Sequence, residues 1–333
     1  MAVDVALIQY FAYLVIEGGT KYNLTKAVTA ITLEEQEGQL AEEATLTVAA
    51  DSEVQGEDVK SIMKLNRVIR ISADWGEGKK KIFEGILWEW EYQHAQQKTL
   101  SIVAYDPMIR LQQGKDHKYF SAGMDTKALI SAICGDFGVS VSYKWKNSMK
   151  HEKKVFRSNT VIDMVMELLE EVRKQKGGKY VTLYRDGKLE INNYGTNKEV
   201  YKFGPKVTLS TKDKLTMDKL VTRVKVLGKA DDKGRSSVDA VVNGNLDFGI
   251  LQEIVTRDSD KDLGKAKAEA NTIIKERGKP EESIIVTAPD LPFLRKGDAV
   301  NMAAGNLSGK MYVLGVSHNA ATRQMSMTLT RDV

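Results

Sequence analysis

The sequence predicts an α+β fold in which two β-barrel modules flank, and interleave with, a smaller α/β insertion. Alternating apolar residues, many of them β-branched or aromatic, fill the first and last thirds of the chain. Helical periodicity is strongest between them, at about residues 113–205. The two β-rich parts also resemble one another in their order of strands and turns. We therefore expect three domains, at residues 1–112, 113–205 and 206–333.

The composition is that of an ordinary folded protein with more than one domain. Of 333 residues, 42% are hydrophobic and 28% are charged, and a chain this long buries about three quarters of its unfolded surface. The net charge of +4 does not favour a nucleic-acid-binding surface, which needs basic residues clustered on one face. We interpret the basic runs at 79–81 and 144–154 as solvated turns or edge-strand protection, with nucleic-acid contact as the alternative.

The most apolar stretch, VALIQYFAYLVI, covers residues 5–16. It is too short to span a bilayer. No basic segment precedes it and no small-residue cleavage site follows it, so we do not expect a signal peptide. We expect an initial strand or a partner-binding segment, and no membrane anchor.

The first module is predicted to be a small β-barrel or a strongly bent sheet. Period-two patterning recurs in several runs, with glycines or charges at the bends between them. These runs are Ile31 with Leu33, Leu46 with Val48, and residues 68–71, 82–90 and 100–105.

The middle segment is predicted to contain two amphipathic helices, at 126–137 and 160–175. Ser158 and Asn159 are candidate N-caps of the second helix, which we expect to end near Gly177 and Gly178. Asp186–Gly187, placed between two alternating runs, predicts a two-residue hairpin turn.

The last segment returns to strands, in LVTRVKVLG, SVDAVVNG, GILQEIVT and the closing 50 or so residues. One helix is predicted at about 262–277, with alanines and isoleucines on one face and Gly278 followed by Pro280 at its end. The face consists of Ala266, Ala270, Ile273 and Ile274.

The closing strands resemble those of the first module. In both places a strand, a glycine turn with lysine, a second strand, a polar bend and a third strand follow one another, ending at Asp106 or Asp332. When the two segments are aligned by residue type, Phe83-Glu84-Gly85 corresponds to Val313-Leu314-Gly315. Duplication of one module and chance similarity between β-hairpins both remain open.

The residues that usually carry chemistry do not form a recognisable site. The four histidines have no spacing typical of a zinc site, and Ser317 and His318 should point to opposite faces of a strand. The only cysteine, Cys134, lies on a helical apolar face and is expected to be a buried hydrophobe, with a nucleophile as the alternative. The histidines are His94, His117, His151 and His318. We therefore predict no catalytic, cofactor-binding or metal-binding residues, and no enzyme.

Two further groups of residues are candidate sites. Acidic clusters could supply a carboxylate pair for glycoside hydrolysis, but we expect them to lie in exposed turns. Trp88, Trp90 and Tyr92 share one face of a predicted strand, where they could stack on sugars or bases, form a subunit interface or cover a local core. The acidic clusters are Glu34, Glu35 and Glu37, Glu42 and Glu43, and Asp231 and Asp232.

Several longer segments carry a family resemblance. The segments KLVTRVKVLGKADDKGR, GILQEIVTRDSDKDLGKAKAEANTII, APDLPFLRKGDAVNM and YVLGVSHNAATRQMSMTLTR, with the earlier YDPMIRLQQGKDHKYFSAGM, occur in this order. In this order the chain resembles baseplate hub proteins of contractile phage tails and of phage-tail-like (R-type) bacteriocins of Gram-positive bacteria, the late control D-like tail hub family. The resemblance covers most of the chain, and its motifs are structural.

The resemblance implies two tail-tube-like β-barrels per chain and a homotrimer whose six barrels form a pseudo-sixfold ring. Such a ring adapts the tail tube to the central spike protein, beside other baseplate subunits. Its lumen could pass DNA without binding it specifically. Assembly in the bacterial cytoplasm and release within the particle are implied, and the end of the chain at Val333 suggests no fused hydrolase. A carbohydrate-binding β module, and less so a peptidoglycan hydrolase, are the competing interpretations.

Overall fold

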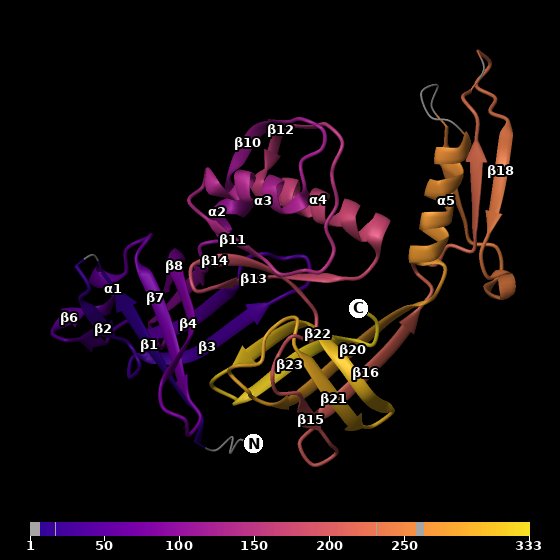
Figure 1. The fold of residues 1–333 in the computed structure, drawn as a ribbon. Helices are drawn as coiled ribbons and strands as arrows, with labels where there is room; N and C mark the ends of the chain where they lie inside the picture. Colours follow the sequence, from indigo (N-terminus) through magenta and orange to yellow (C-terminus); the bar gives the residue numbers. More distant parts are fainter. Residues whose placement is uncertain (1–6, 17, 231, 258–262) are drawn as a thin grey trace. The chain divides into compact units, whose positions relative to one another are not determined.

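Strands make up more of the described chain than helices do. The structure, a computed structural model, describes residues 7–16, 18–230, 232–257 and 263–333 (Figure 1). A sheet of 13 strands contains strands from both β-rich parts of the chain, in the order β16-β20-β23-β22-β3-β4-β9-β8-β7-β1-β2, with β21 and β15 branching from β22. The predicted predominance of β structure is confirmed, whereas no closed barrel is seen among these strands. The chain divides into two compact units, residues 1–211 with 285–333 (unit 1) and residues 212–284 (unit 2). The three predicted domains stay a prediction.

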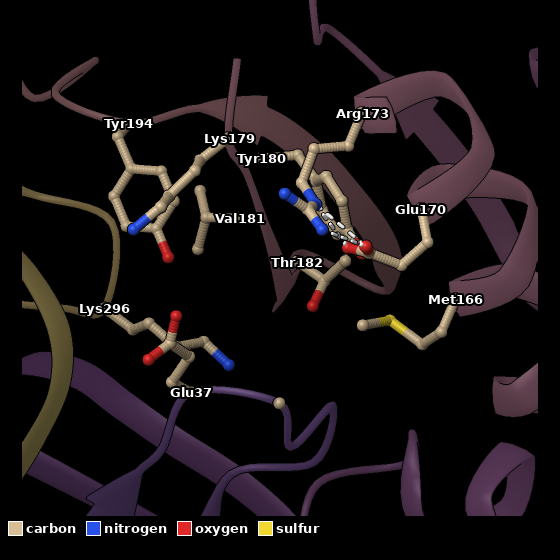
Figure 2. Close-up of a pocket in the computed structure, with 11 residues that line it drawn as sticks. Glu37, Met166, Glu170, Arg173, Lys179, Tyr180, Val181, Thr182, Tyr194 and Lys296 are labelled. Carbon is tan, nitrogen blue, oxygen red and sulfur yellow. Dashed lines mark hydrogen bonds and ion pairs between the residues drawn. The ribbon is translucent and has the colours of Figure 1, made fainter. Parts of the chain in front are cut away.

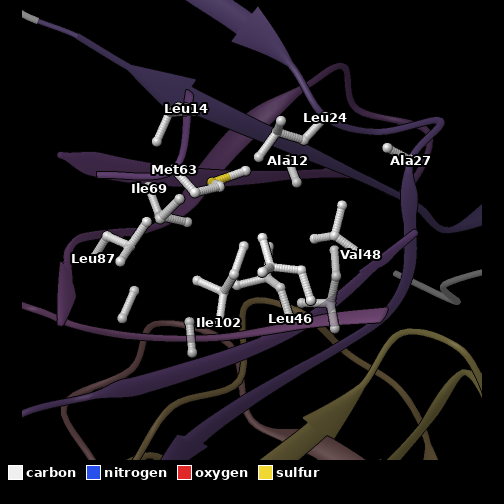
Figure 3. Close-up of a cluster of buried hydrophobic side chains, with 14 of the residues drawn as sticks. Ala12, Leu14, Leu24, Ala27, Leu46, Val48, Met63, Ile69, Leu87 and Ile102 are labelled. Carbon is white, nitrogen blue, oxygen red and sulfur yellow. The ribbon is translucent and has the colours of Figure 1, made fainter. Parts of the chain in front are cut away.

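The first β module, in indigo and purple in Figure 1, surrounds an apolar core. Residues of alternating strands point inward, and Leu14, Leu46, Ile69 and Ile102 are fully buried (Figure 3). Each such side chain stabilises the fold by about 1.5–3 kcal/mol. The module contains β1 Gln9–Val15, β2 Lys21–Asn23, β3 Val28–Glu35, β4 Glu43–Ala49, β5 Glu53–Val54, β6 Glu57–Asp58, α1 Val59–Ile62, β7 Val68–Asp74, β8 Lys80–Gln93 and β9 Thr99–Tyr105. The apolar N-terminal stretch thus supplies an initial strand, although residues 5 and 6 lie outside the described part.

The middle segment packs two helices against two small sheets. Predicted helices are confirmed as α3 Thr126–Gly135 and α4 Val161–Lys176, and Asp186–Gly187 joins β13 Tyr180–Arg185 to β14 Lys188–Asn193 with positive φ at both turn residues. The predicted caps of α4 are wrong, because Ser158 has a positive φ and Thr160 accepts the Asp163 N–H instead. The remaining elements are α2 Ile109–Gln113, β10 Lys115–Phe120, β11 Ser140–Tyr143 and β12 Lys154–Thr160.

Unit 2 is a three-stranded sheet with one helix on its face. The central strand β17 pairs antiparallel with β18 and parallel with β19, and α5 covers one side of the sheet with Ala266 and Ala270. The helix predicted at 262–277 is therefore confirmed over its described residues. The elements are β17 Arg223–Leu227, β18 Val238–Asn243, the 3-10 helix η2 Leu246–Phe248, β19 Gln252–Thr256 and α5 Leu263–Arg277.

The second β module repeats the strand order of the first. Its order β16-β20-β23-β22-β21-β15 corresponds to β3-β4-β9-β8-β7-β1, and in both modules these strands follow the same chain order. One departure is that β1 runs antiparallel to β7 whereas β15 runs parallel to β21. Residues 217–280, which form most of unit 2, are inserted between β16 and β20, where the first module has a short connection. The strands are β15 Tyr201–Phe203, β16 Ser210–Thr216, β20 Glu281–Pro289, β21 Ala299–Ala304, β22 Leu307–Asn319 and β23 Gln324–Thr330.

The registers of the two modules agree as well. In β8 the bulge residue Trp88 lies between the Leu87–Ala104 and Glu89–Val103 pairs, and in β22 Leu314 lies between equivalent pairs with β23. Two residues before each bulge, Ile86 pairs with Val68 and Tyr312 with Ala299. The strand registers thus make Glu89 the counterpart of Gly315, whereas alignment by residue type makes Gly85 its counterpart. Shared order, bulge and register support duplication over chance similarity.

Candidate functional site

The two β modules join edge to edge within one sheet. The last residues of β3 pair antiparallel with the end of β22, from Glu35–Val316 to Thr32–Asn319. Ser317 also donates a side-chain hydrogen bond to Glu34 across this seam, at 3.2 Å. We call this seam, with the charged side chains beside it, the module junction. It is the feature around which the buried polar groups of unit 1 gather.

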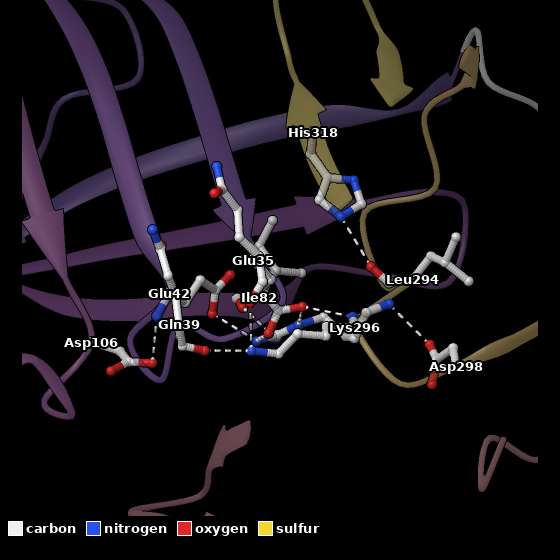
Figure 4. A network of polar contacts seen from close by, with 11 residues as sticks. Glu35, Gln39, Glu42, Ile82, Asp106, Leu294, Lys296, Asp298 and His318 are labelled. Atoms are coloured by element: carbon white, nitrogen blue, oxygen red, sulfur yellow. Dashed lines mark hydrogen bonds and ion pairs between the residues drawn. The ribbon is translucent and has the colours of Figure 1, made fainter. Parts of the chain in front are cut away.

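Arg295, in the connection between β20 and β21, is the centre of the junction. Figure 4 shows the residues around it, among them Glu35, Glu42 and Lys296. Its guanidinium donates to both oxygens of Glu35, at 2.9 and 2.7 Å, and to Glu42 Oε2 at 2.7 Å. A longer bond of 3.3 Å reaches the carbonyl of Ile82 in β8. One side chain of the second module therefore holds three segments of the first.

Lys296 extends the same network. Its backbone N–H donates to Glu35 at 2.9 Å, and its ammonium donates to the carbonyls of Gln36 and Gln39 at 3.1 and 2.7 Å. Asp106, directly after β9, accepts from the backbone of Glu42 at 3.0 Å and of Met108 at 2.8 Å. These bonds satisfy groups that would be costly to bury without partners.

The carboxyl groups of the junction differ in their pKa. Burial raises the pKa of Glu35, but the Arg295 and Lys296 charges outweigh it and lower the value to about 2. Burial raises the pKa of Glu42 to about 8, an effect that Arg295 opposes and the charges of Glu35 and Asp106 reinforce. Burial likewise raises the pKa of Asp106 to about 7, against its backbone hydrogen bonds. Glu35 is thus the firmly ionised partner of Arg295.

The expectation that the acidic clusters lie in exposed turns is wrong for two of them. Glu35 and Glu42 are only 6% and 7% exposed. The charge of Glu35 is tolerated in the interior because Arg295 and Lys296, about 260 residues away in sequence, approach it. Glu37 and Asp232 are exposed, Glu34 and Glu43 are half-buried, and Asp231 lies outside the described residues.

A second polar contact links the modules through the N-terminal strand. The Tyr10 hydroxyl donates to Asp290, whose other oxygen is 2.7 Å from His318 Nδ1. The second ring nitrogen of His318 lies 2.9 Å from the Leu294 carbonyl. Burial and Asp290 together raise the pKa of Tyr10, so the hydroxyl stays a donor. His318 has a structural partner on each side.

The remaining candidate residues of the sequence are not brought together. His151 is buried between Thr126 and Glu171, while His94 and His117 are exposed. Burial raises the pKa of Cys134 to about 12, which leaves its thiol protonated in the core of the middle segment. Ser317 and His318 reach different partners, as the alternation of a strand requires. The described residues hold no cluster of His, Cys, Asp or Glu arranged to bind a metal ion.

The predicted row of three aromatic residues on β8 is split by the bulge. Trp90 and Tyr92 pack against the core of the first module, and Trp88 is 40% exposed beside the ring of Tyr105. An extra residue in a strand reverses the alternation beyond it, so Leu87 shares the inner face with Trp90. These residues therefore do not form a flat stacking platform.

Two depressions of unit 1 lie beside the junction. One of about 330 Å³ contains Glu170, which Arg173 and Tyr180 hold by hydrogen bonds, and Lys296 (Figure 2). The other, of about 630 Å³, borders Glu42, Asp106 and Arg295. In both, the charged groups named have hydrogen-bond partners within the protein, as expected of structural contacts. Within the described residues no helix is long and apolar enough to cross a membrane.

Comparison with known proteins places the chain among phage-related proteins. The model of a family described as YqbQ-like matches residues 16–331. Two Bacillus subtilis (strain 168) relatives, the uncharacterized protein YqbQ and the phage-like element PBSX protein XkdQ, are each 22% identical over 223 and 222 residues, or 66% of this chain and 67% of theirs.

Solved structures show the same fold at low identity. The prophage MuSo2 43 kDa tail protein from Shewanella oneidensis matches with a TM-score of 0.72 at 13% identity, over 97% of this chain and 98% of that one. The E. coli c3393 protein, a type VI secretion component described as similar to T4 tail proteins gp27 and gp5, matches with a TM-score of 0.55 at 10% identity, over 91% and 73%. The fold is therefore that of phage tail proteins.

Proposed function

Since the chain belongs to the YqbQ-like family, we propose that it is a non-catalytic structural protein of a phage-type tail, and specifically its baseplate hub. In this role three copies form a ring of six similar β modules. The ring adapts a sixfold tail tube to a central spike, in a contractile phage tail or an R-type bacteriocin particle. The other partners are the remaining baseplate subunits.

The duplicated β module is the observation that carries the proposal. A threefold object can dock on a sixfold one if each copy offers two equivalent surfaces, and the two modules share strand order, bulge and register. Closed cyclic symmetry is also the common form of stable homo-oligomers. The fold likeness to a tail protein and to a gp27-like secretion component agrees with this role.

A rigid adaptor also explains the buried charges better than catalysis does. Arg295 engages Glu35 and Glu42, and Lys296 is held by carbonyls, so these groups fix one module against the other. Acid catalysis would instead need one carboxyl group facing a substrate cleft without such partners. The protein is accordingly proposed to act through its interfaces.

The proposal is tested by purifying the protein with its tail tube and spike proteins and imaging the mixture by electron microscopy. We expect a ring with a mass of three times 37.1 kDa at the end of the tube. Particles assembled in cells lacking the protein should lack an ordered baseplate. Complete particles formed without it, or a protein absent from purified particles, would refute the hub function.

A further inference from the structure

We propose that copies of this chain join head to tail, by pairing of strand β16 of one copy with residues 89–93 of β8 in the next. We call β16 the donor edge and residues 89–93 the acceptor edge. The inference gives the proposed ring its contact between copies, and it rests on the proposed function only for the number of copies that close the ring.

The acceptor edge has a strand on one side only. Residues Lys80–Ile86 of β8 pair with β7, and from Ile86 to Gln93 the strand pairs with β9. Leu87 still exchanges backbone hydrogen bonds with Asn66 and Arg67, at 2.9 and 2.7 Å. Beyond Leu87, no other strand in the described part of the chain pairs with β8 opposite β9. The inward side chains Trp90 and Tyr92 are accordingly only half-buried.

The same position in the second module is occupied. By the register match, residues 90–93 of β8 correspond to residues 316–319 of β22. Those residues pair with β23 on one side and with β3 on the other. The module junction therefore shows within one chain how this edge is filled, and the strand that fills it is β3 of the other module.

The strand that corresponds to β3 is β16, and it is the terminal strand of the sheet. β3 lies between β4 and β22, whereas β16 has β20 on one side and no other strand among the described residues. Each chain thus presents one unfilled donor of the β3 type and one unfilled acceptor of the β22 type. The unfilled donor edge and the unfilled acceptor edge belong to the same chain. If the geometry of the module junction is repeated, the donor edge of one copy pairs with the acceptor edge of another copy.

The side chains at the two edges favour association. Folded proteins usually protect open strand edges, yet Leu209 and Leu215 beside and within the donor edge are 55% and 70% exposed. On the acceptor side Trp88 and Leu65 are 40% and 59% exposed. The donor edge also carries Lys212 and Lys214, whereas the acceptor edge carries Glu89 and Glu91. Opposite charges of this kind steer association and disfavour pairing of two donor edges.

A contact of one surface with a different surface either closes into a ring or continues as a fibre. In the proposed ring, the internal junction and the contact between copies alternate. Each contact then joins a first module to a second module by one shared geometry, so the six modules are related by similar rotations. The pairing of β16 with β8 is the contact that decides whether the chain assembles.

The test exchanges charges between the edges and measures mass by light scattering over a range of concentrations. The double variants Lys212→Glu/Lys214→Glu and Glu89→Lys/Glu91→Lys should each raise the concentration needed for assembly about tenfold or more, and the variant with all four changes should recover most of that loss. Lys275→Glu/Lys279→Glu, which alters exposed lysines of α5 and the residues after it, should assemble as the unchanged protein does. Circular dichroism checks that every variant is folded.

The outcomes separate this inference from the hub function. If the unchanged protein assembles and the charge variants assemble equally well, the ring uses other surfaces and only the inference is wrong. A protein that stays monomeric at every concentration also overturns the inference, because the contact needs no other protein. The hub function would then be judged by the protein's place in tail particles.

Discussion

Replacing Arg295 with methionine should destabilise unit 1 because it leaves the buried carboxylate of Glu35 without its cation. The guanidinium donates two hydrogen bonds to Glu35 and one to Glu42. Charged hydrogen bonds contribute about 1.5–3 kcal/mol each, but the Lys296 amide continues to bond Glu35. We therefore expect a loss near the range for a broken buried ion pair, about 3–5 kcal/mol. That is a large part of a typical stability of about 5–15 kcal/mol.

The loss should depend on pH with a defined sign. The lowered pKa of Glu35 means that its ion pair stabilises the fold above about pH 4.5, and that this stability is lost as the pH falls toward 2. The variant lacks this contribution, so the difference between the two proteins should be largest near neutral pH and shrink in acid.

Urea unfolding followed by tryptophan fluorescence measures this loss directly. All four tryptophans, Trp75, Trp88, Trp90 and Trp145, belong to unit 1, so the signal reports on that unit. Arg157→Met, at an exposed position, is the matched control and should cost less than about 0.5 kcal/mol. A loss equal to that of the control, or one that does not change between pH 3 and pH 7, would refute the reasoning.

Three further changes test other parts of the fold. The raised pKa of Glu42 means that the folded protein keeps a proton on this side chain that the unfolded chain has lost, so the free energy of unfolding should fall as the pH rises from about 4.5 to 8. Glu42→Gln should make this fall smaller. Urea unfolding at pH 5 and pH 8 that gives the same difference in free energy for both proteins would contradict this. Leu168→Ala, at a fully buried position of α4, should cost about 2–5 kcal/mol in the same assay, against a small effect of exposed Lys174→Ala; equal effects would mean that α4 is not packed as described. Replacing residues 217–280 by a short glycine-serine turn should leave the tryptophan signal of unit 1 unchanged and its melting temperature within a few degrees, because unit 2 has its own apolar core. Loss of the cooperative transition would show that unit 1 needs the deleted residues to fold.

Local patterns determined most of the secondary structure. The apolar face of α4, the glycines that follow it and the Asp186–Gly187 turn act within a few residues of one another. These signals are readable from neighbouring residues, so the sequence predicts the elements well, even though packing against the rest of the core supplies most of the stability of α4. The cap at Thr160 was missed because the unusual backbone of Ser158 is not visible in local preferences.

The bulge at Trp88 shows where period-two patterning fails. One extra residue reverses the inward and outward directions of everything beyond it, so a face predicted from alternation alone is wrong past that point. For the same reason, alignment of the two β modules by residue type is shifted from the correspondence that the strand registers give. The sequence could show that two similar segments exist, but only backbone pairing shows which residues correspond.

The sequence by itself indicated a phage-tail-type protein, the β-rich character, the main helices and the likeness of the two β modules, because these depend on local periodicity and on the order of motifs. Tertiary structure alone decided that β3 pairs with β22 and that Glu35 and Glu42 are buried against Arg295. The physical reason is separation along the chain: these contacts join residues about 250 to 285 positions apart. No preference of the residues near either partner specifies which distant charge or strand edge it will meet.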